Sequence, residues 1–215
     1  MKALVTGFEP FGGEALNPSL VAIRRLPARL GDIALTAAVL PVVYDEVLPR
    51  LRAAIASASP DIVLCTGLAG GRPALSLERV AINIDDARIP DNAGNQPIDR
   101  PVAADGPPAY FATLPLKAAV AALRNAGLPA IVSNSAGTFL CNHAFYGLMH
   151  EAVRAEPGRV FRGGFLHVPY LPEQAARVPD APSMALDQIV AGIQIILAVA
   201  AAHTDDLLVG EGALA

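Results

Sequence analysis

Short apolar runs rich in β-branched residues alternate along the chain with longer segments whose apolar positions recur every three or four residues. The first pattern is typical of buried strands and the second of helices. The apolar runs predict strands at Lys2–Thr6, Ile33–Val43, Asp61–Thr66, Val80–Ile84, Ala130–Asn134 and Phe161–Val168. The periodic segments predict helices at Pro18–Leu30, Asp45–Ser57, Lys117–Asn125, Phe139–Ala155 and Ser183–Ala202. This alternation predicts one α/β domain over residues 1–215, with a mostly parallel twisted sheet and helices on both faces.

Two regions depart from this pattern. Residues 85–115 are rich in proline, asparagine and glycine, and a long stretch of this kind inside a compact domain is usually functional. The tail after His203 is weakly patterned, so we expect it to be mobile.

Composition excludes several classes of protein. With 53% hydrophobic and 17% charged residues, the chain of 215 residues is not expected to be disordered. A net charge of −4 without a basic block makes nucleic acid a poor candidate partner. The longest apolar stretch, Ile189–Ala202, is shorter than the roughly 20 residues of a membrane-spanning helix, so we expect a core helix and no membrane partner. Two cysteines with no zinc-site spacing favour a reducing compartment, and the start of the chain lacks the features of a signal peptide, so we expect a cytoplasmic protein.

One of the cysteines is a candidate nucleophile. Cys141 follows a predicted strand and a turn of small residues, and it falls in the first turn of the helix predicted from Phe139. The free amides and the positive dipole end of that turn are expected to lower the thiol pKa and to stabilise an oxyanion. Cys65 lies inside an apolar strand, where a core-packing role is the better interpretation.

Four histidines compete for the role of base. His167 comes at the end of a predicted strand, and ligand sites in open α/β sheets gather at the carboxyl ends of strands, so His167 and Cys141 can converge. His143 is two positions from Cys141 on one helix and points away from it, so we favour a structural role. His150 and His203 are expected to lie on helices with no role in the chemistry.

Glu78 is a candidate for the acid that orients the histidine. Asp85 and Asp86 are adjacent in sequence, so in an extended segment they point in opposite directions and do not form a paired carboxylate site.

Two glycine-rich loops follow predicted strands. Residues 67–72 resemble a phosphate-binding loop only loosely, because the spacing and the Lys-Ser/Thr pair of a nucleotide loop are absent, and the backbone of such a loop suits a small amide equally well. Residues 7–13 carry Phe8 and Phe11, which either cover the core or form an apolar slot for a flat ring.

Four blocks together resemble the pyroglutamyl peptidase I (pyrrolidone-carboxylate peptidase) family. They are residues 5–13 with Asn-Pro-Ser at 17–19, residues 67–99, residues 133–146 and residues 165–174, in the order found in the family. The segments Glu-Arg-Val-Ala-Ile-Asn and Ser-Ala-Gly-x-x-x-Cys-Asn-His are the most specific. The resemblance implies a single α/β domain, often a dimer or tetramer, that removes pyroglutamate from the N-terminus of peptides.

The resemblance also assigns roles to residues. It implies Glu78 as the acid, Cys141 as the nucleophile and His167 as the base of a cysteine exopeptidase, with no metal and no cofactor. It implies a pyroglutamate pocket formed by Phe8, Phe11, Ile89, Phe139 and Leu140, a backbone contact from Leu68, and Arg88 near the oxyanion. Some relatives carry a polar residue at the position of Leu68.

Other functions remain open at this point. One is a different thiol amidase on the same scaffold. Another is a phosphate- or nucleotide-binding module built on residues 67–72. A third is an inactive relative that serves as an interaction protein, against which the presence of Glu78, Cys141 and His167 argues.

Overall fold

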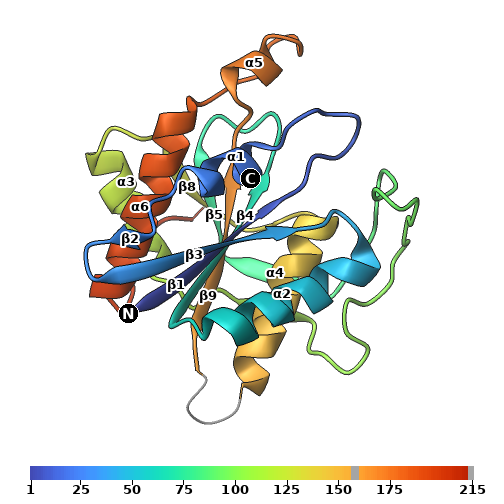
Figure 1. Ribbon diagram of the computed structural model, residues 1–215, viewed down its shortest axis with the longest axis horizontal. Coiled ribbons are helices and arrows are strands. Elements are labelled where there is room, and N and C mark those ends of the chain that lie inside the picture. The colour runs from blue at the N-terminus through green and yellow to red at the C-terminus, as the bar shows by residue number, and fades with distance from the viewer. Residues whose placement is uncertain (156–159, 213–215) are drawn as a thin grey trace.

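The computed structural model describes residues 1–155 and 160–212. A seven-stranded sheet in the order β2-β3-β1-β4-β9-β5-β8 forms its centre (Figure 1). The strands are β1 (Lys2–Phe8), β2 (Arg29–Leu30), β3 (Ile33–Leu40), β4 (Ile62–Leu68), β5 (Leu75–Glu78), β8 (Ala130–Ser133) and β9 (Arg162–Val168). Four of the six neighbouring pairs are parallel, and the β2–β3 and β5–β9 pairs are antiparallel. The predicted mostly parallel sheet is thereby confirmed.

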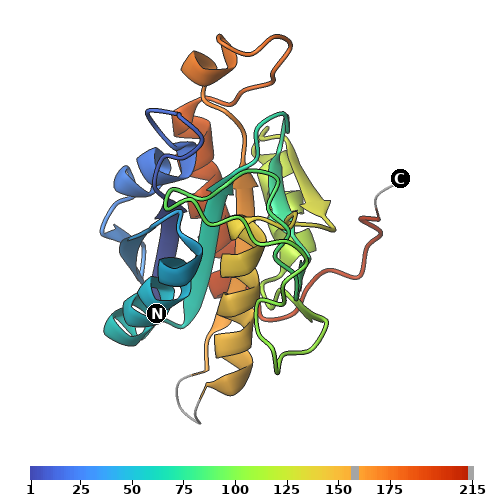
Figure 2. The ribbon, with the colours of Figure 1, turned by 90° about the vertical axis from the view of Figure 1, so that its right-hand side faces the viewer.

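Helices cover both faces of this sheet, as predicted. On one face lie α2 (Tyr44–Ala58) and α4 (Leu140–Arg154), and on the other lie α1 (Pro18–Arg24), α3 (Leu116–Asn125) and α6 (Leu186–Ala202) (Figures 1 and 2). A short helix, α5 (Pro172–Ala175), follows β9, and β6 (Val80–Ile82) pairs with β7 (Ala109–Phe111) in a small antiparallel sheet.

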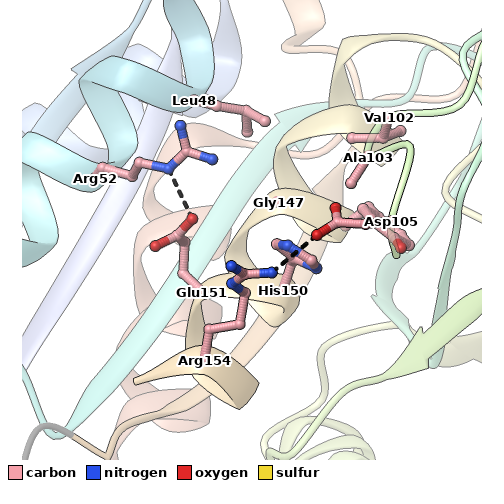
Figure 3. Close-up of a pocket in the computed structure, with 10 residues that line it drawn as sticks. Leu48, Arg52, Val102, Ala103, Asp105, Gly147, His150, Glu151 and Arg154 are labelled. Atoms are coloured by element: carbon pink, nitrogen blue, oxygen red, sulfur yellow. Dashed lines mark hydrogen bonds and ion pairs between the residues drawn. The ribbon is translucent and has the colours of Figure 1, made fainter. Parts of the chain in front are cut away.

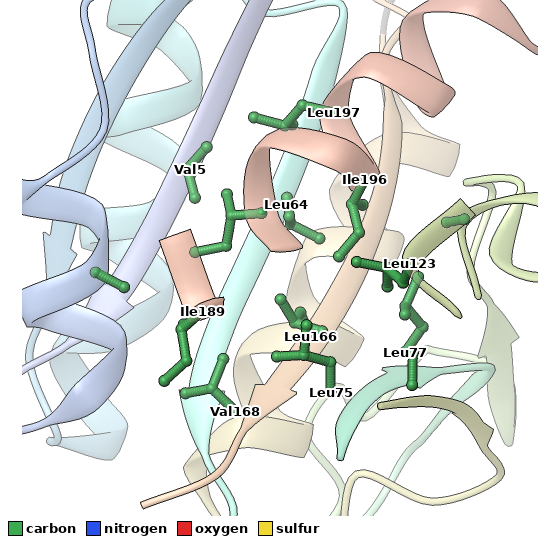
Figure 4. Close-up of a cluster of buried hydrophobic side chains, with 14 of the residues drawn as sticks. Val5, Leu64, Leu75, Leu77, Leu123, Leu166, Val168, Ile189, Ile196 and Leu197 are labelled. Carbon is green, nitrogen blue, oxygen red and sulfur yellow. The ribbon is translucent and has the colours of Figure 1, made fainter. Parts of the chain in front are cut away.

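The alternation of side chains along the central strands produces two cores. In β4, Ile62 and Leu64 pack in the core under α6, whereas Val63 and Cys65 pack in the core under α4. Figure 4 shows the first core, in which Ile189 and Ile196 of α6 lie over the sheet. Strands buried on both faces read as continuous apolar runs, which explains why β1 and β4 are visible in the sequence. No helix in the described residues is long and apolar enough to span a membrane.

Several predicted boundaries are wrong, and proline accounts for two of them. The first helix ends at Arg24 rather than at Leu30, shortly before Pro27, because the residue in front of a proline is disfavoured in a helix. The chain then turns into the short strand β2. The strand β3 ends at Leu40 rather than Val43, because Pro41 has no amide hydrogen for the ladder. The first helix is capped by Asn17, whose side chain accepts a hydrogen bond from the Ser19 amide.

Four elements were not predicted: β2, β5, β7 and α5. Each has four residues or fewer, too few for a periodic pattern to show. The tail after His203 also differs from expectation. The Asp206 carboxylate accepts hydrogen bonds from the Lys117 and Ala118 amides at the start of α3, and Glu211 pairs with Arg124 at 2.7 Å. The tail therefore has defined contacts with α3.

Candidate active site

A buried acid and histidine meet on the α4 side of the sheet. Glu78 ends β5 and lies opposite Phe165 of the antiparallel strand β9, while His167 lies opposite Ser76. Glu78 and His167 are therefore diagonal neighbours on one face, within the reach of long side chains. The His167 Nδ1 atom donates a hydrogen bond of 2.7 Å to Glu78 Oε1, and the two residues are 4% and 0% exposed. This bond orients the ring and leaves Nε2 as the nitrogen that can accept a proton.

The candidate nucleophile lies over the neighbouring strand. Gly67 of β4 is paired in register with His167 of β9, and a Cβ atom built on Gly67 would lie 2.8 Å from Cys141 Sγ. The sulfur thus occupies the space that the missing side chain of Gly67 leaves open, next to the strand that carries His167. The structure brings together the three residues predicted from separate parts of the sequence.

The helix that carries Cys141 begins at Leu140, one residue later than predicted. Its N-cap residue, Phe139, makes no side-chain capping hydrogen bond, and the first turn contains no acidic residue. The amides of the first turn are among those that a helix cannot satisfy internally, so they can donate to a negatively charged oxygen beside Cys141.

The expectation that the helix start lowers the pKa of Cys141 is contradicted. Burial, with the nearby charge of Glu78 as the second cause, raises the pKa of Cys141 to about 12, and Arg72 opposes this rise only in part. Burial also lowers the pKa of His167, although the hydrogen bond and charge of Glu78 oppose this. Desolvation of both groups therefore favours a neutral thiol and a neutral imidazole in the resting pair.

Aromatic side chains gather in front of the nucleophile helix. The ring centroids of Phe11 and Phe139 lie 6.1 Å apart, and the Tyr44 ring meets Phe139 edge-on at 5.8 Å. Phe11 and Phe139 are partly buried, whereas Phe8 and Leu140 are 2% and 1% exposed and belong to the core under α4.

The other predicted contacts lie on two segments. Leu68 is the last residue of β4, and its side chain is partly buried. Ile89 is partly buried and Arg88 is exposed on the loop that follows β6.

This loop is held to the rest of the site by hydrogen bonds. The Thr138 hydroxyl donates to Asp86 O, and the Asn92 side chain donates to Pro10 O. The Asp91 carboxylate accepts from the amides of Tyr44, Ala93 and Asn95 and from the Asn95 side chain. Residues 85–95 therefore connect the 9–13 loop, the start of α2 and the turn before α4.

The structural role favoured for His143 agrees with its surroundings. Its Nδ1 atom donates a hydrogen bond of 2.8 Å to Asp85, which is buried, whereas Asp86 is exposed. His150 lies on α4 and contacts the Tyr110 hydroxyl at 2.9 Å. His203 follows α6 as its C-cap residue, one position beyond the helix, and is exposed.

A separate hollow of about 300 Å³ lies between α2, α4 and the 102–105 segment (Figure 3). Its charged groups pair with one another: Arg52 with Glu151 at 2.7 Å, and Arg154 with Asp105 at 3.2 Å. None of Glu78, Cys141 and His167 lines it. Within residues 1–155 and 160–212, no cluster of His, Cys, Asp and Glu is arranged to hold a metal ion.

Sequence reasoning missed one functional candidate. The pattern of the 67–72 segment suggests only a backbone loop, but the Arg72 Nη1 atom lies 2.6 Å from Glu78 Oε1. This loop continues into strand β5 rather than into a helix, so it lacks the helix N-terminus of a phosphate-binding loop. The one signal in the sequence is an arginine six positions before the candidate acid, across a Pro-containing turn.

Comparisons with known proteins show the family of the chain. A family model described as pyroglutamyl peptidase matches residues 1–203. A pyrrolidone-carboxylate peptidase of Streptomyces coelicolor is 55% identical over 99% of this chain and 98% of its own length. The crystal structure of pyroglutamyl peptidase I from Bacillus amyloliquefaciens superposes with a TM-score of 0.93 at 48% identity, covering 97% of this chain and 99% of that one. A pyrrolidone carboxyl peptidase from Thermococcus litoralis gives 0.92 at 36% identity, with 97% and 99% covered. The chain belongs to the pyroglutamyl peptidase family.

Proposed function

We propose that this chain removes pyroglutamate from the N-terminus of peptides through a thioester on Cys141. One observation carries the proposal. The Cys141 sulfur lies over Gly67, which is paired with His167 on the neighbouring strand, and the buried Glu78 carboxylate orients the His167 ring. One α/β domain supplies all three groups.

The reaction follows the roles of these groups. His167 Nε2 takes the proton of the Cys141 thiol as the sulfur attacks the pyroglutamyl carbonyl, and Glu78 stabilises the imidazolium that forms. The amides at the start of α4 donate to the oxyanion. His167 then protonates the leaving amine, and water, activated by the same imidazole, hydrolyses the thioester. Because both resting groups are neutral, no ion pair needs to be maintained in the buried site before substrate binds.

The ring of the substrate fits an apolar slot. Pyroglutamate is an uncharged lactam, and we assign its contacts to Phe8, Phe11, Ile89, Phe139 and Leu140, with the Leu68 backbone at the lactam amide and Arg88 near the oxyanion. Support comes from the proximity of Phe11 and Phe139 just before the nucleophile. The near-complete burial of Phe8 and Leu140 gives them the role of a wall behind the partly buried rings of Phe11 and Phe139. A free N-terminal ammonium would lose its hydration in this slot without gaining a partner, which costs several kcal/mol.

We further propose a cytoplasmic enzyme that works as a dimer or tetramer. Both cysteines are free, and a reducing compartment protects a nucleophilic thiol from oxidation. The oligomer rests on the resemblance to the family. Light scattering of the purified protein tests the oligomeric state.

A side-by-side assay of pyroglutamyl, prolyl, glutaminyl and alanyl fluorogenic amides tests the activity. We expect turnover of the pyroglutamyl amide and very low rates on the others, because a prolyl group shares the ring but carries a charge and lacks the lactam carbonyl. Comparable rates on prolyl and pyroglutamyl amides would contradict the substrate assignment. Equal turnover of all four would favour a general thiol amidase.

A further inference from the structure

Arg72 makes three contacts that join separate parts of the active site. Its Nη1 atom donates to Glu78 Oε1 at 2.6 Å and to Ser133 Oγ at 3.3 Å. Its Nη2 atom donates to the Ser135 carbonyl at 3.1 Å. Ser133 ends β8, and Ser135 lies in the turn that leads into the helix of Cys141. One guanidinium therefore contacts the acid and the segment that precedes the nucleophile.

Arg72 and His167 share the same oxygen of Glu78. The His167 Nδ1 atom donates to Oε1 at 2.7 Å, so Oε1 accepts two hydrogen bonds, whereas the buried Oε2 atom has no partner among the described residues. A carboxylate held by two donors on one oxygen has a defined orientation. The guanidinium keeps its charge at every accessible pH, so Glu78 faces a permanent cation on one side and a titrating imidazole on the other.

The loop that carries Arg72 is itself constrained. A Cβ atom on Gly70 would lie 2.3 Å from the ring of Tyr170, which follows β9, and Gly71 has a φ of +88°. The close contact and the left-handed backbone both favour glycine at these two positions. The Arg72 side chain is also only 31% exposed, so its position is set by packing as well as by charge.

We infer that Arg72 is a positioning residue of the peptidase reaction, which holds the Glu78 carboxylate against His167 and fixes the turn that leads to Cys141. This inference rests on the proposed function, because the reaction it serves is the one assigned to Cys141, His167 and Glu78. It adds a fourth residue, which does not itself touch the reacting atoms.

The charge of Arg72 also acts on the two reacting groups. It contributes to the lowered pKa of His167 and opposes the raised pKa of Cys141. The other titratable groups around the pair are Glu78 from β5, Cys65 from β4 and Tyr44 from α2. Among Arg72 and these three groups, Arg72 carries the only positive charge at neutral pH, so its removal should raise the pKa of both His167 and Cys141.

The test compares Arg72→Gln, Arg72→Lys and, as a control for loss of a cation, Arg25→Gln. Arg25 is exposed and pairs with Asp187 on the opposite face of the sheet. We expect Arg72→Gln to lower kcat roughly 10- to 100-fold, because the acid and the nucleophile turn lose their common anchor. In Arg72→Gln, the fall of kcat/KM on the acidic side of the pH profile should begin at higher pH, because His167 becomes easier to protonate. Arg72→Lys keeps the charge but loses the planar guanidinium that donates to several acceptors at once. Its kcat should therefore fall, while the acidic side of its pH profile stays near that of the wild type. Arg25→Gln should match the wild type.

Alkylation by iodoacetamide gives a readout that does not depend on the substrate. The apparent pKa for labelling of Cys141 should rise in Arg72→Gln and stay unchanged in Arg25→Gln. An unaltered pH profile and labelling curve in a folded Arg72→Gln protein would overturn the inference. If that variant does not fold, a wild-type kcat in Arg72→Lys would overturn it. Shifted labelling without any pyroglutamyl cleavage in the wild type would refute the proposed function, while it would still show that the charge of Arg72 acts on Cys141.

Discussion

The sulfur of Cys141 lies where the side chain of residue 67 would be if that residue were not glycine. A Cβ atom on Gly67 would come within 2.8 Å of Cys141 Sγ and within 3.0 Å of the Phe165 ring. Gly67 is also the residue paired with His167 in the β4–β9 register. The absence of a side chain at one strand position therefore allows Cys141, the proposed nucleophile, to approach the sheet next to His167, the proposed base.

Replacing Gly67 by alanine should displace the nucleophile and leave the fold intact. The atom most crowded by the new methyl group is the end of the Cys141 side chain, which can rotate away, so we expect the melting temperature to change little. A displacement of about 1 Å should lower kcat roughly 100-fold. The matched control is Gly210→Ala, where a Cβ atom meets no neighbour within 4 Å. Wild-type kcat in Gly67→Ala would show that the sulfur does not use this space during the reaction.

The two cysteines should differ in reactivity and in importance. Burial raises the pKa of both thiols to about 12, but Cys141 is partly accessible, whereas Cys65 is 0% exposed. We expect iodoacetamide to inactivate the enzyme by labelling Cys141 alone, as mass spectrometry of the labelled peptide can establish. Cys141→Ser should lose at least ~10³ of kcat. Cys65→Ala should keep its specific activity at a temperature where it is folded, and a fully active Cys141→Ala would end the thiol mechanism.

The base and its acid should contribute unequally. His167→Ala removes the only group assigned to proton transfer and should abolish turnover while leaving a folded protein. Glu78→Gln keeps the size of the side chain but not its charge, so it should lower kcat by less than His167→Ala, because Glu78 orients and stabilises the imidazole without taking its proton. His203→Ala, at an exposed position after α6, is the control. A Glu78→Gln protein slower than His167→Ala would reverse the assigned roles.

The aromatic slot predicts a loss of substrate selectivity in Phe11→Ala. Loss of ring burial and stacking at the 6.1 Å contact with Phe139 should cost ~1–3 kcal/mol. The kcat/KM for pyroglutamyl amides should then fall roughly 10- to 100-fold. Alkylation of Cys141 should be nearly unchanged, because the nucleophile is untouched. Phe111→Ala is the control, since Phe111 is 68% exposed on β7. Equal losses of kcat/KM in Phe11→Ala and Phe111→Ala would show that the loss does not come from the aromatic slot.

Asp91 should make the stability of the 85–95 segment dependent on pH. Burial would raise the pKa of Asp91, but hydrogen bonds from Asn95, Tyr44 and Ala93 outweigh it and hold the pKa below its ordinary value. The carboxylate therefore stabilises the fold above its unfolded pKa of about 4, and this contribution is lost as the pH falls through the lower folded pKa. At pH 7, Asp91→Asn should reduce the free energy of unfolding by about 1–3 kcal/mol.

Urea denaturation at several pH values measures this dependence. The difference in the free energy of unfolding between the wild type and Asp91→Asn should become smaller as the pH falls below about 4. Asp32→Asn, at an exposed position between β2 and β3, should remain close to the wild type at each pH. A difference that stays constant down to acid pH would indicate that the charge of Asp91 contributes nothing.

Much of this protein follows from local chemistry that the sequence displays. Strands buried on both faces must be continuously apolar, so β1, β4 and β9 are visible as runs. The Asn17 cap with the proline after it marks the start of α1, and the strand, small-residue turn and helix around Cys141 predict its place in a first helical turn. These features depend on residues within a few positions of one another, and the family motifs that lie in them are enough to single out Glu78, Cys141 and His167 as candidates from the sequence alone.

The tertiary structure decided how these residues act together. The four-residue strand β5 has no visible pattern, yet its antiparallel pairing with β9 places Glu78 diagonally from His167. Arg72 joins the site only because its loop folds back over the end of β5. The pKa of Cys141 is raised, whereas the helix start alone predicts that it is lowered. The rise comes from desolvation by all the groups packed around the sulfur, and these come from parts of the chain that are distant in sequence.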